Sequence, residues 1–432
     1  MRSDAHRLAY DQAGAESSIV KESAVSKTRR TQLTTRRRLA RESGRRLTPF
    51  DRLASLVPLC RIQCGSFLIR LAFHSTPLMP NPTRAFLLGP LLKGVSRSFY
   101  LTLRVLPPGM RDPIGLAYLL ARAADTIADT SIVPPAERLS LLLSLRAAVN
   151  GASDERAQMR RVAVQVAAQQ TQSDERVLLE SLEPALAILP QLSDDDRNAV
   201  REIVTTLTQG MEFDLRTFPD EQSGDIVALR EWDALDRYTY MVAGCVGEFW
   251  TKMTYAHLPG TLSETSDVMI ERGVRFGKAL QMTNVLRDCS KDLRIGRCYL
   301  PSTLLERFGL APRDLLEPDA SLRAQPLMHE LVGKALENYR AAIDYTLAIP
   351  ARAVRLRLAC VWPILIGLET LELLVANPLW LEPGRASKIR RGDVYRILAL
   401  SIPAVMSDTL LRGWMQRLIA RVDAQRRIEA DG

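Results

Sequence analysis

Apolar residues recur every three or four positions over several long stretches of this chain, the spacing at which side chains share one face of an α-helix. The clearest such stretches are residues 137–149, 174–189, 197–215 and 327–347. Alternating patterns typical of strands are sparse, and no Gly/Ser-rich or Pro-rich linker divides the chain after residue 84. The pattern therefore predicts an all-α fold, with one large helical domain over residues 81–432.

Local signals predict where three of the helices begin. They are Pro134 and Pro135 before Glu137, Ser193 before the run Asp194 to Asp196, and Thr261 with Glu264 in the spacing of a capping box. We interpret the aspartate run as the start of a helix rather than as a metal site, because negative charge is favourable at a helix N-terminus.

Two other apolar stretches are long enough to raise the question of a membrane span. In residues 396–422, the charges of Asp408, Arg412 and Arg417 and the kink expected at Pro403 argue against one. Residues 358–374 are more continuously apolar. We interpret them as a buried core helix, with the lining of a substrate tunnel as the functional alternative.

The net charge of +9 has one location, because residues 1–80 hold 15 Lys and Arg against 6 Asp and Glu. The remainder holds 43 of each sign. This segment lacks the apolar core and cleavage site of a secretory signal, and Arg61 and Arg70 interrupt its apolar part. We expect a disordered or non-native extension, with Met79 as an alternative start. A basic membrane-surface segment and a nucleic-acid arm are alternatives, although the aromatic interleaving of the latter is missing.

The six cysteines and four histidines are scattered and lack the spacing of a zinc site. We expect Cys245, Cys289, Cys298 and Cys360 to behave as small reduced hydrophobic residues of a cytoplasmic protein. The sequence has no Walker loop and no Gly-x-Gly-x-x-Gly motif after a strand. No motif therefore indicates where a nucleotide would bind.

Two Asp-x-x-x-Asp motifs lie about 160 residues apart, Asp125 with Asp129 and Asp288 with Asp292, each after an apolar helical stretch. A spacing of four places both carboxylates on one helical face, where like charges repel. Mg²⁺ binds through one or two carboxylates and shares its remaining coordination with water and phosphate. The motifs predict a diphosphate held through Mg²⁺ between two facing helices, with solvated faces carrying local ion pairs as the alternative.

Other polar residues fall on the same helical stripes. Arg122 lies three residues before Asp125, and Gln281, Asn284 and Asp288 follow one another at helical spacing. A polar stripe on an otherwise apolar helix is typical of a cleft lining.

Four segments together resemble the squalene and phytoene synthase family, whose members join two prenyl diphosphates head to head. They are residues 95–111, 117–129, 238–250 and 277–301, in the family's order, within a match over about residues 84–385. The resemblance implies the isoprenoid synthase fold, a single helical domain with a central cleft. It also implies Mg²⁺ as a cofactor, and NADPH if the product is squalene.

The resemblance also implies roles for individual residues. Asp125, Asp129, Asp288 and Asp292 would hold the Mg²⁺ ions that bridge the two diphosphates. The remaining residues are Ser96 and Arg97 in a loop over the diphosphate, Arg122 and Arg287 as cationic contacts, Gln281 and Asn284 in the cleft, and Tyr118 and Tyr240, counted with the two arginines as catalytic.

Within the family the chain is most like bacterial squalene synthases. Met241 stands where eukaryotic squalene synthases tend to carry Tyr, whereas Tyr240 and residues 294–301 resemble the bacterial carotenoid branch. The resemblance implies condensation of two farnesyl diphosphates through presqualene diphosphate toward squalene. Phytoene synthase acting on geranylgeranyl diphosphate is the alternative, and a non-catalytic assembly factor with this fold is an alternative of another class. We expect a cytoplasmic monomer with peripheral contact to the inner face of a membrane and no nucleic-acid partner.

Overall fold

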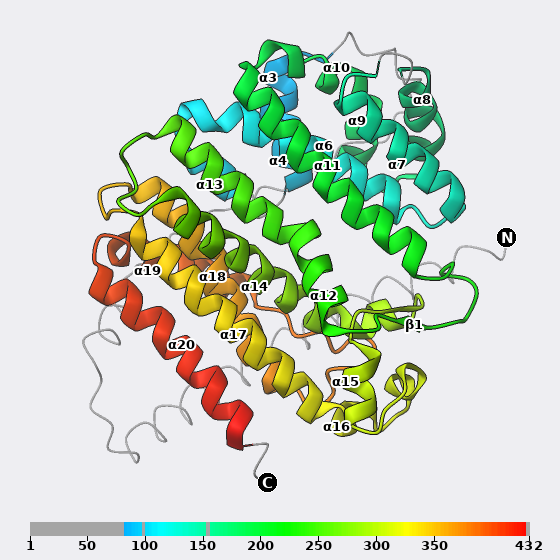
Figure 1. The fold of residues 1–432 in the computed structure, drawn as a ribbon, viewed down its shortest axis with the longest axis vertical. Coiled ribbons are helices and arrows are strands. Elements are labelled where there is room, and N and C mark those ends of the chain that lie inside the picture. Colours follow the sequence, from blue (N-terminus) through cyan, green and yellow to red (C-terminus); the bar gives the residue numbers. More distant parts are fainter. Residues whose placement is uncertain (1–81, 97–99, 153–155, 429–432) are drawn as a thin grey trace, which may run out of the picture. The chain divides into compact units, whose positions relative to one another are not determined.

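The computed structural model describes residues 82–96, 100–152 and 156–428. This part of the chain is helical apart from two strands of two residues each (Figure 1). The prediction of an all-α fold is confirmed. The predicted boundary near residue 80 stays a prediction, because residues 1–81 lie outside the described part.

The described elements up to the first strand are α3 (Arg84–Phe86), η1 (Leu87–Leu91), α4 (Leu92–Ser96), α5 (Tyr100–Val105), α6 (Pro108–Asp129), α7 (Pro135–Val149), α8 (Arg156–Arg161), η4 (Val162–Val166), η5 (Ala167–Gln169), α9 (Ser173–Glu180), α10 (Leu182–Leu186), η6 (Leu189–Gln191), α11 (Asp194–Thr217) and β1 (Val227–Ala228). They are followed by α12 (Trp232–Thr239), η7 (Tyr240–Gly244), α13 (Cys245–His257), α14 (Ser266–Leu293), β2 (Arg297–Cys298), α15 (Ser302–Arg307), η8 (Pro312–Leu316), α16 (Ala320–Arg323), α17 (Gln325–Ala348), α18 (Val354–Val375), α19 (Arg391–Ala404) and α20 (Asp408–Ile428).

Three of the four predicted helices are confirmed, since residues 137–149, 197–215 and 327–347 fall within α7, α11 and α17. Two of the predicted starts are confirmed as well. Pro134 is the N-cap residue of α7. The Ser193 hydroxyl caps α11 by accepting a hydrogen bond from the backbone amide of Asp196 at 3.2 Å.

Two predicted helix boundaries are wrong. Residues 174–189 form two helices, α9 and α10, that are interrupted at Ser181. In one continuous helix Pro184 could not donate to the carbonyl of Glu180, whereas in the first turn of α10 its missing N–H costs nothing. The other boundary is the start of α14, whose N-cap is Thr265 rather than Thr261. Thr261 instead closes a turn by donating its backbone N–H to Leu258.

α14 is the central helix of the described fold, packed against α13, η7, α17 and α18, while α6 packs against α11 (Figure 1). Glycines permit the closest of these contacts. A Cβ atom on Gly247 would lie 1.8 Å from the carbonyl oxygen of Gly273, and one on Gly277 would lie 2.1 Å from that of Ala243. α13 and η7 therefore rest directly on the backbone of α14.

The two apolar stretches differ in how they fold. α18 is long and apolar enough to cross a membrane by length and composition, yet 72% of its most apolar window is buried inside the described fold. This burial supports the interpretation of residues 358–374 as a core helix. The second stretch is divided, because α19 ends at Ala404 just after Pro403 and α20 begins at Asp408.

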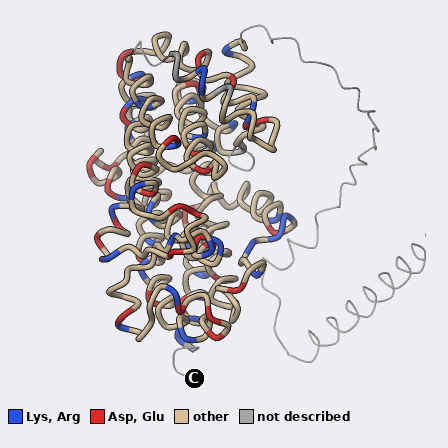
Figure 2. Tube along the Cα trace, turned by 90° about the vertical axis from the view of Figure 1, so that its right-hand side faces the viewer, with Lys and Arg blue, Asp and Glu red and all other residues tan. Residues whose placement is uncertain are grey.

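Charge and cysteine placement follow the sequence-based expectations for the body of the chain. Lys and Arg residues are interspersed with Asp and Glu residues along the described helices (Figure 2). Cys245, Cys289, Cys298 and Cys360 are buried and free.

Candidate active site

Both acidic motifs lie at the C-terminal ends of their helices. Asp125 and Asp129 occupy the last two turns of α6, which ends at Asp129, and Asp288 and Asp292 occupy the last two turns of α14, which ends at Leu293. A helix C-terminus carries partial negative charge from its unpaired carbonyl groups, so carboxylates are unfavourable there. Neither pair is placed where it would stabilise its own helix.

The carboxylates within each motif also repel each other. Burial and the neighbouring Asp129 raise the pKa of Asp125 to about 6. Burial and Asp288 raise the pKa of Asp292 to about 7, and Asp129 of the other motif adds to this rise. Gln281 of α14 lines one cavity with Asp125 and Asp129, so the C-terminal part of α14 lies near the end of α6, and the facing of the two motifs stays a prediction.

Two arginines pair with the acidic motifs. Arg122 bridges Asp125 and Glu175 of α9, with Nη2 at 2.5 Å from the Glu175 carboxylate. Arg287 pairs with Asp288, and its Nε lies 3.0 Å from Oδ1. Both guanidinium groups are partly exposed. They are cationic forks beside the carboxylates, and a guanidinium fork also suits an incoming phosphate.

A cavity of about 200 Å³ opens beside the first acidic motif. Its lining comes from five parts of the fold: Asp125, Ala128 and Asp129 of α6, Leu207, Met211, Asp214 and Leu215 of α11, Tyr238 with Val242, Gln281 of α14, and Arg297 of β2. The structure thus brings Gln281 to Asp125 and Asp129. Asn284, one turn further along α14, donates a hydrogen bond to Gln281 at 3.3 Å.

An apolar pocket of about 300 Å³ adjoins this cavity. Asp125, Leu207 and Met211 line both spaces. The other pocket residues are Ile114, Ala117, Tyr118, Ala121, Arg122, Ile203, Val246, Phe249 and Trp250. Asp125 therefore lies where a charged cavity meets an apolar one, an arrangement that fits a ligand with a charged head and a hydrocarbon tail.

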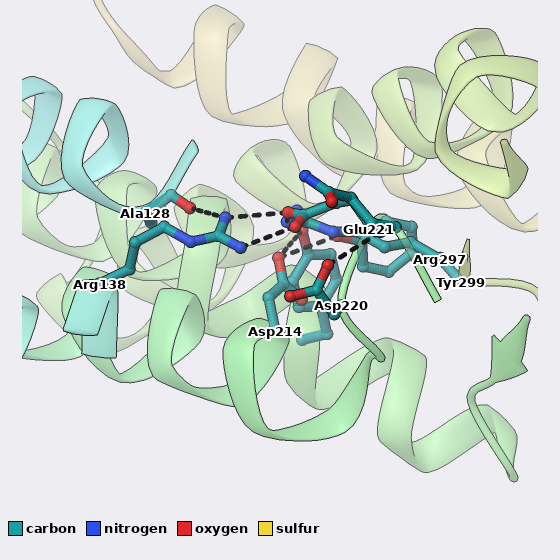
Figure 3. Close-up of polar contacts among 9 residues, drawn as sticks. Ala128, Arg138, Asp214, Asp220, Glu221, Arg297 and Tyr299 are labelled. Atoms are coloured by element: carbon teal, nitrogen blue, oxygen red, sulfur yellow. Dashed lines mark hydrogen bonds and ion pairs between the residues drawn. The ribbon is translucent and has the colours of Figure 1, made fainter. Parts of the chain in front are cut away.

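A buried polar network forms one wall of the cavity (Figure 3). Asp214 accepts hydrogen bonds at Oδ2 from the hydroxyls of Tyr299 at 2.8 Å and Tyr238 at 3.3 Å. The two tyrosine rings stack with centroids 4.6 Å apart. Burial raises the pKa of Asp214 to about 7, although Arg297 and the tyrosine hydroxyls oppose the rise. Its other oxygen, Oδ1, is buried and accepts no hydrogen bond from the described residues.

The network continues to the end of α6. Arg297 donates to Glu221 at 3.0 Å, and Arg138, which is 1% exposed, holds the same carboxylate with two hydrogen bonds of 2.9 and 2.7 Å. Arg138 also donates to the carbonyl of Ala128 at 2.8 Å (Figure 3). A buried cation therefore satisfies the carbonyl end of α6 next to Asp129.

None of this network was predicted from the sequence, and its members come from five separate segments. The pairing of β1 with β2, in which Val227 lies opposite Arg297, fixes the position of Arg297 at the cavity. Sequence reasoning noted Arg297 and Tyr299 only as part of residues 294–301, which resemble the bacterial carotenoid branch. It gave them no place at the site.

The structure does not bring Tyr240 to the acidic motifs. Its hydroxyl donates to Glu248 at 2.9 Å, and it lines a separate small hollow with Glu202 and Lys252. Burial and Glu248 raise its pKa to about 12. Tyr238 and Val242, four residues apart, share the helical face toward the cavity, and residue 240 points away from that face. Tyr238 rather than Tyr240 therefore lines the cavity, and the catalytic role of Tyr240 stays a prediction.

Of the two predicted loop residues, Ser96 does not line the cavity. Ser96 is buried at the end of α4, where its hydroxyl donates to the backbone carbonyl of Leu92. Arg97 lies outside the described residues.

The carboxylates fit Mg²⁺ as shared rather than complete ligand sets. Within the described ranges no group of three or more His, Cys, Asp and Glu side chains could hold a metal ion by itself. Mg²⁺ usually keeps several waters and binds through one or two carboxylates plus substrate phosphates. The two carboxylate pairs match that donor chemistry, and the pKa values of Asp125 and Asp292 are raised.

Comparison with known proteins identifies the family. The model of the squalene/phytoene synthase family matches residues 92–392. The chain belongs to the squalene/phytoene synthase family. The matched part of this family member runs from α4 to the start of α19 and includes both acidic motifs, the cavity wall and Arg297.

Curated relatives of this family member carry two kinds of names. A bifunctional lycopene cyclase/phytoene synthase from Pyrenophora tritici-repentis is 28% identical over 324 residues, which are 75% of this chain and 49% of that protein. A squalene synthase from Dictyostelium discoideum is 27% identical, over 59% of this chain and 56% of that protein. One from Yarrowia lipolytica is 25% identical, over 71% of this chain and 65% of that protein. The chain thus spans about half the length of the first of these relatives.

Solved structures share the fold. The TcSQS protein in a ligand complex has a TM-score of 0.62 at 19% identity, with 80% of this chain and 98% of that chain covered. A dehydrosqualene synthase in complex with a ligand has a TM-score of 0.50 at 20% identity, over 77% of this chain and 96% of the other. The predicted isoprenoid synthase fold is therefore confirmed.

Proposed function

We propose that this protein is a prenyltransferase that joins two farnesyl diphosphates head to head, through presqualene diphosphate, toward squalene. One observation carries the proposal. Asp125 and Asp129 at the C-terminus of α6 line a charged cavity together with Gln281 of α14, this cavity adjoins an apolar pocket, and the second aspartate pair lies at the C-terminus of α14. The squalene synthases among its relatives support the choice of product.

The first step to be catalysed breaks the C1–O bond of the donor, and the electron pair leaves with the diphosphate. The allylic cation that remains is attacked by the C2=C3 double bond of the acceptor, which keeps its own diphosphate. The new bond joins C1 of the donor to C2 of the acceptor and leaves the cation at C3 of the acceptor; loss of one proton from C1 of the donor then forms its bond to C3 and closes a cyclopropane ring. The products are presqualene diphosphate, one pyrophosphate and one proton, so atoms and charge balance.

The chain's own residues would assist by placing positive charge at the leaving group. Arg122 and Arg287 each hold a carboxylate of an acidic motif. A diphosphate that reaches the cavity offers these forks phosphate oxygens in place of the carboxylates. The apolar pocket around Tyr118 and Phe249 would hold a prenyl chain and keep water from the cation.

The Mg²⁺ ions proposed for this site would be held by Asp125, Asp129, Asp288 and Asp292, and they would neutralise charge on the departing diphosphate. Reduction of presqualene diphosphate to squalene needs a hydride donor, for which NADPH stays a prediction. The described residues contain no glycine-rich turn after a strand that would fit its phosphates, and the two strands are only two residues long.

Phytoene synthase is the second candidate, because the relative from Pyrenophora tritici-repentis carries that activity in its name. The pockets that distinguish the two substrates differ by apolar contacts only. A non-catalytic assembly factor with this fold is disfavoured by the intact aspartate pairs.

We further propose a cytoplasmic monomer in peripheral contact with a membrane, because long prenyl chains partition into lipid.

The proposal is tested by incubating the full-length protein with Mg²⁺ and either farnesyl or geranylgeranyl diphosphate, with and without NADPH, and extracting the lipids. We expect presqualene diphosphate from farnesyl diphosphate alone and squalene when NADPH is added. Phytoene from geranylgeranyl diphosphate, with farnesyl diphosphate unused, would establish the second candidate instead. No product from either substrate would refute the prenyltransferase proposal.

A further inference from the structure

The outer side of α19 exposes large apolar side chains. Tyr395 and Ile402, seven residues apart and therefore on one side of the helix, are 68% and 59% exposed. Met406 in the following turn and Leu410 in the first turn of α20 are 56% and 46% exposed. Single exposed apolar residues are common, but a row of them marks an interaction surface. We call these four residues the α19 face.

The opposite side of α19 is anchored in the fold. Ile397, Ser401 and Ala404 are buried. The Ser401 hydroxyl accepts a hydrogen bond from the indole N–H of Trp362 in α18 at 2.9 Å. The helix is therefore held in place by one side, while its other side presents apolar groups outward.

Basic residues flank the α19 face. Residues 385–396 contain five Lys and Arg against one Asp. Arg396 is engaged by Glu369 and Asp393 at 3.7 and 3.5 Å. Lys388, Arg390 and Arg391 are exposed, and within the described part of the chain they form no ion pair. Apolar side chains bordered by free cations are typical of a helix that lies in the interface of an anionic membrane.

We propose that the α19 face docks on an anionic lipid surface. This deepens the peripheral membrane contact of the proposed function, and it rests on that function only in taking the bilayer as the source of long-tailed substrates. The α19 face lies beyond residue 392, where the family match ends, and its residues line neither the cavity nor the apolar pocket. The α19 face can therefore bind lipid without altering the cavity.

Charge argues against two alternative occupants of the α19 face, the N-terminal segment and a second copy of the chain. The N-terminal segment of residues 1–80 has a net charge of +9, and the basic flank would repel it. A second copy placed symmetrically on the α19 face would bring two basic flanks together. An anionic bilayer is the occupant whose charge complements the flank.

The test uses the full-length protein and sedimentation with two kinds of vesicle, phosphatidylcholine alone and an equal mixture with phosphatidylglycerol. We expect Ile402→Ser/Met406→Ser to lower binding to the mixed vesicles by about tenfold. Arg390→Gln/Arg391→Gln should remove most of the preference for the anionic vesicles. Leu322→Ser is the matched control, because Leu322 is 71% exposed on α16, and it should bind like the parent.

Vesicle binding that is unchanged in both double variants would overturn the proposal. If binding is unchanged while light scattering shows a lower mass for Ile402→Ser/Met406→Ser, the face joins two copies of the chain. If binding is unchanged while residues 1–81 become more sensitive to protease, the N-terminal segment covers it. Turnover with detergent-dispersed farnesyl diphosphate separates this test from the proposed function, because its absence in the parent would refute the function and leave the vesicle result standing.

Discussion

The aspartates at the start of α11 and those at the ends of α6 and α14 have the same side chains in opposite electrostatic settings. Asp194 to Asp196 lie in the first turn of α11, where free backbone N–H groups carry partial positive charge. Asp196 also pairs with His257 at 2.7 Å. Asp129 and Asp292 lie in the last turns of their helices, where the partial charge is negative.

This difference separates a structural role from a functional one. The first run stabilises the helix that carries it, and no ligand is needed to explain it. The two motifs at helix C-termini oppose the helix dipole, and their like charges add to burial in raising the pKa values of Asp125 and Asp292. The Mg²⁺ ions that we propose for these pairs would offset that repulsion, because Mg²⁺ binds through one or two carboxylates together with substrate phosphate.

The largest expected effect is on turnover. Because one lost carboxylate weakens the neutralisation of the leaving diphosphate, Asp125→Asn or Asp288→Asn should lower kcat by at least ~100-fold with the fold unchanged. Asp195→Asn is the matched control, since Asp195 is an exposed member of the α11 run. It should keep the parental rate. Equal rates for all three variants at saturating Mg²⁺ would show that the aspartates at the ends of α6 and α14 contribute no more to turnover than those at the start of α11.

The pH dependence of metal-free stability should also distinguish the two settings. The folded-state pKa values of Asp125 and Asp292, about 6 and about 7, lie above the ordinary value of 3.8. Between these limits the folded protein holds protons that the unfolded chain has lost, so these groups lower stability as pH rises from about 4 to about 7. The melting temperature in chelator should fall over this range, and Asp125→Asn/Asp292→Asn should flatten the fall.

Asp195→Asn serves again as the control for this measurement, because its melting temperature should fall with pH as steeply as that of the parent. A double variant whose melting temperature falls with pH as steeply as that of the parent would contradict the assignment of these two groups.

A smaller effect concerns the cap of α11. Ser193→Ala removes the hydrogen bond to the backbone amide of Asp196 and should cost about 1 kcal/mol of unfolding free energy, measured by urea denaturation. Ser263→Ala is a suitable control, because Ser263 is exposed and lies outside any helix. An unchanged midpoint for Ser193→Ala would mean that the acidic run holds the helix start without its cap.

The smallest expected effect has the opposite sign. Asp129→Asn removes a charge from the C-terminus of α6 and should raise the metal-free unfolding free energy by about 0.5 kcal/mol. The same replacement at Asp195 should lower it by a similar amount. If both variants shift stability in the same direction, helix position does not separate the two acidic runs.

Much of this arrangement could be predicted from the sequence because it depends on local spacing. The helices α7, α11 and α17, the cap at Ser193 and the pairing of the aspartates on helical faces all follow from residues less than about one helix apart. The break at Ser181 was missed because the apolar spacing continues across it.

The cavity wall could not be predicted in this way. Asp214 and Tyr299 are 85 residues apart, and Arg138 and Glu221 are 83 apart, so only the packed fold brings them together. Tyr238 and Tyr240 are two residues apart in the sequence. Which of them lines the cavity depends on the helical face that turns toward it. Such orientations are set by tertiary packing, here by the close approach of η7 to α14 through Gly277.

The most direct test of the account is binding of inorganic pyrophosphate in the presence of Mg²⁺, measured by calorimetry on the full-length protein. We expect binding that requires Mg²⁺, that is lost in Asp125→Asn and in Asp288→Asn, and that is retained in Asp195→Asn. Pyrophosphate binding that is equally strong in chelator, or that survives both motif variants, would contradict the claim that the two aspartate pairs hold a diphosphate through metal ions.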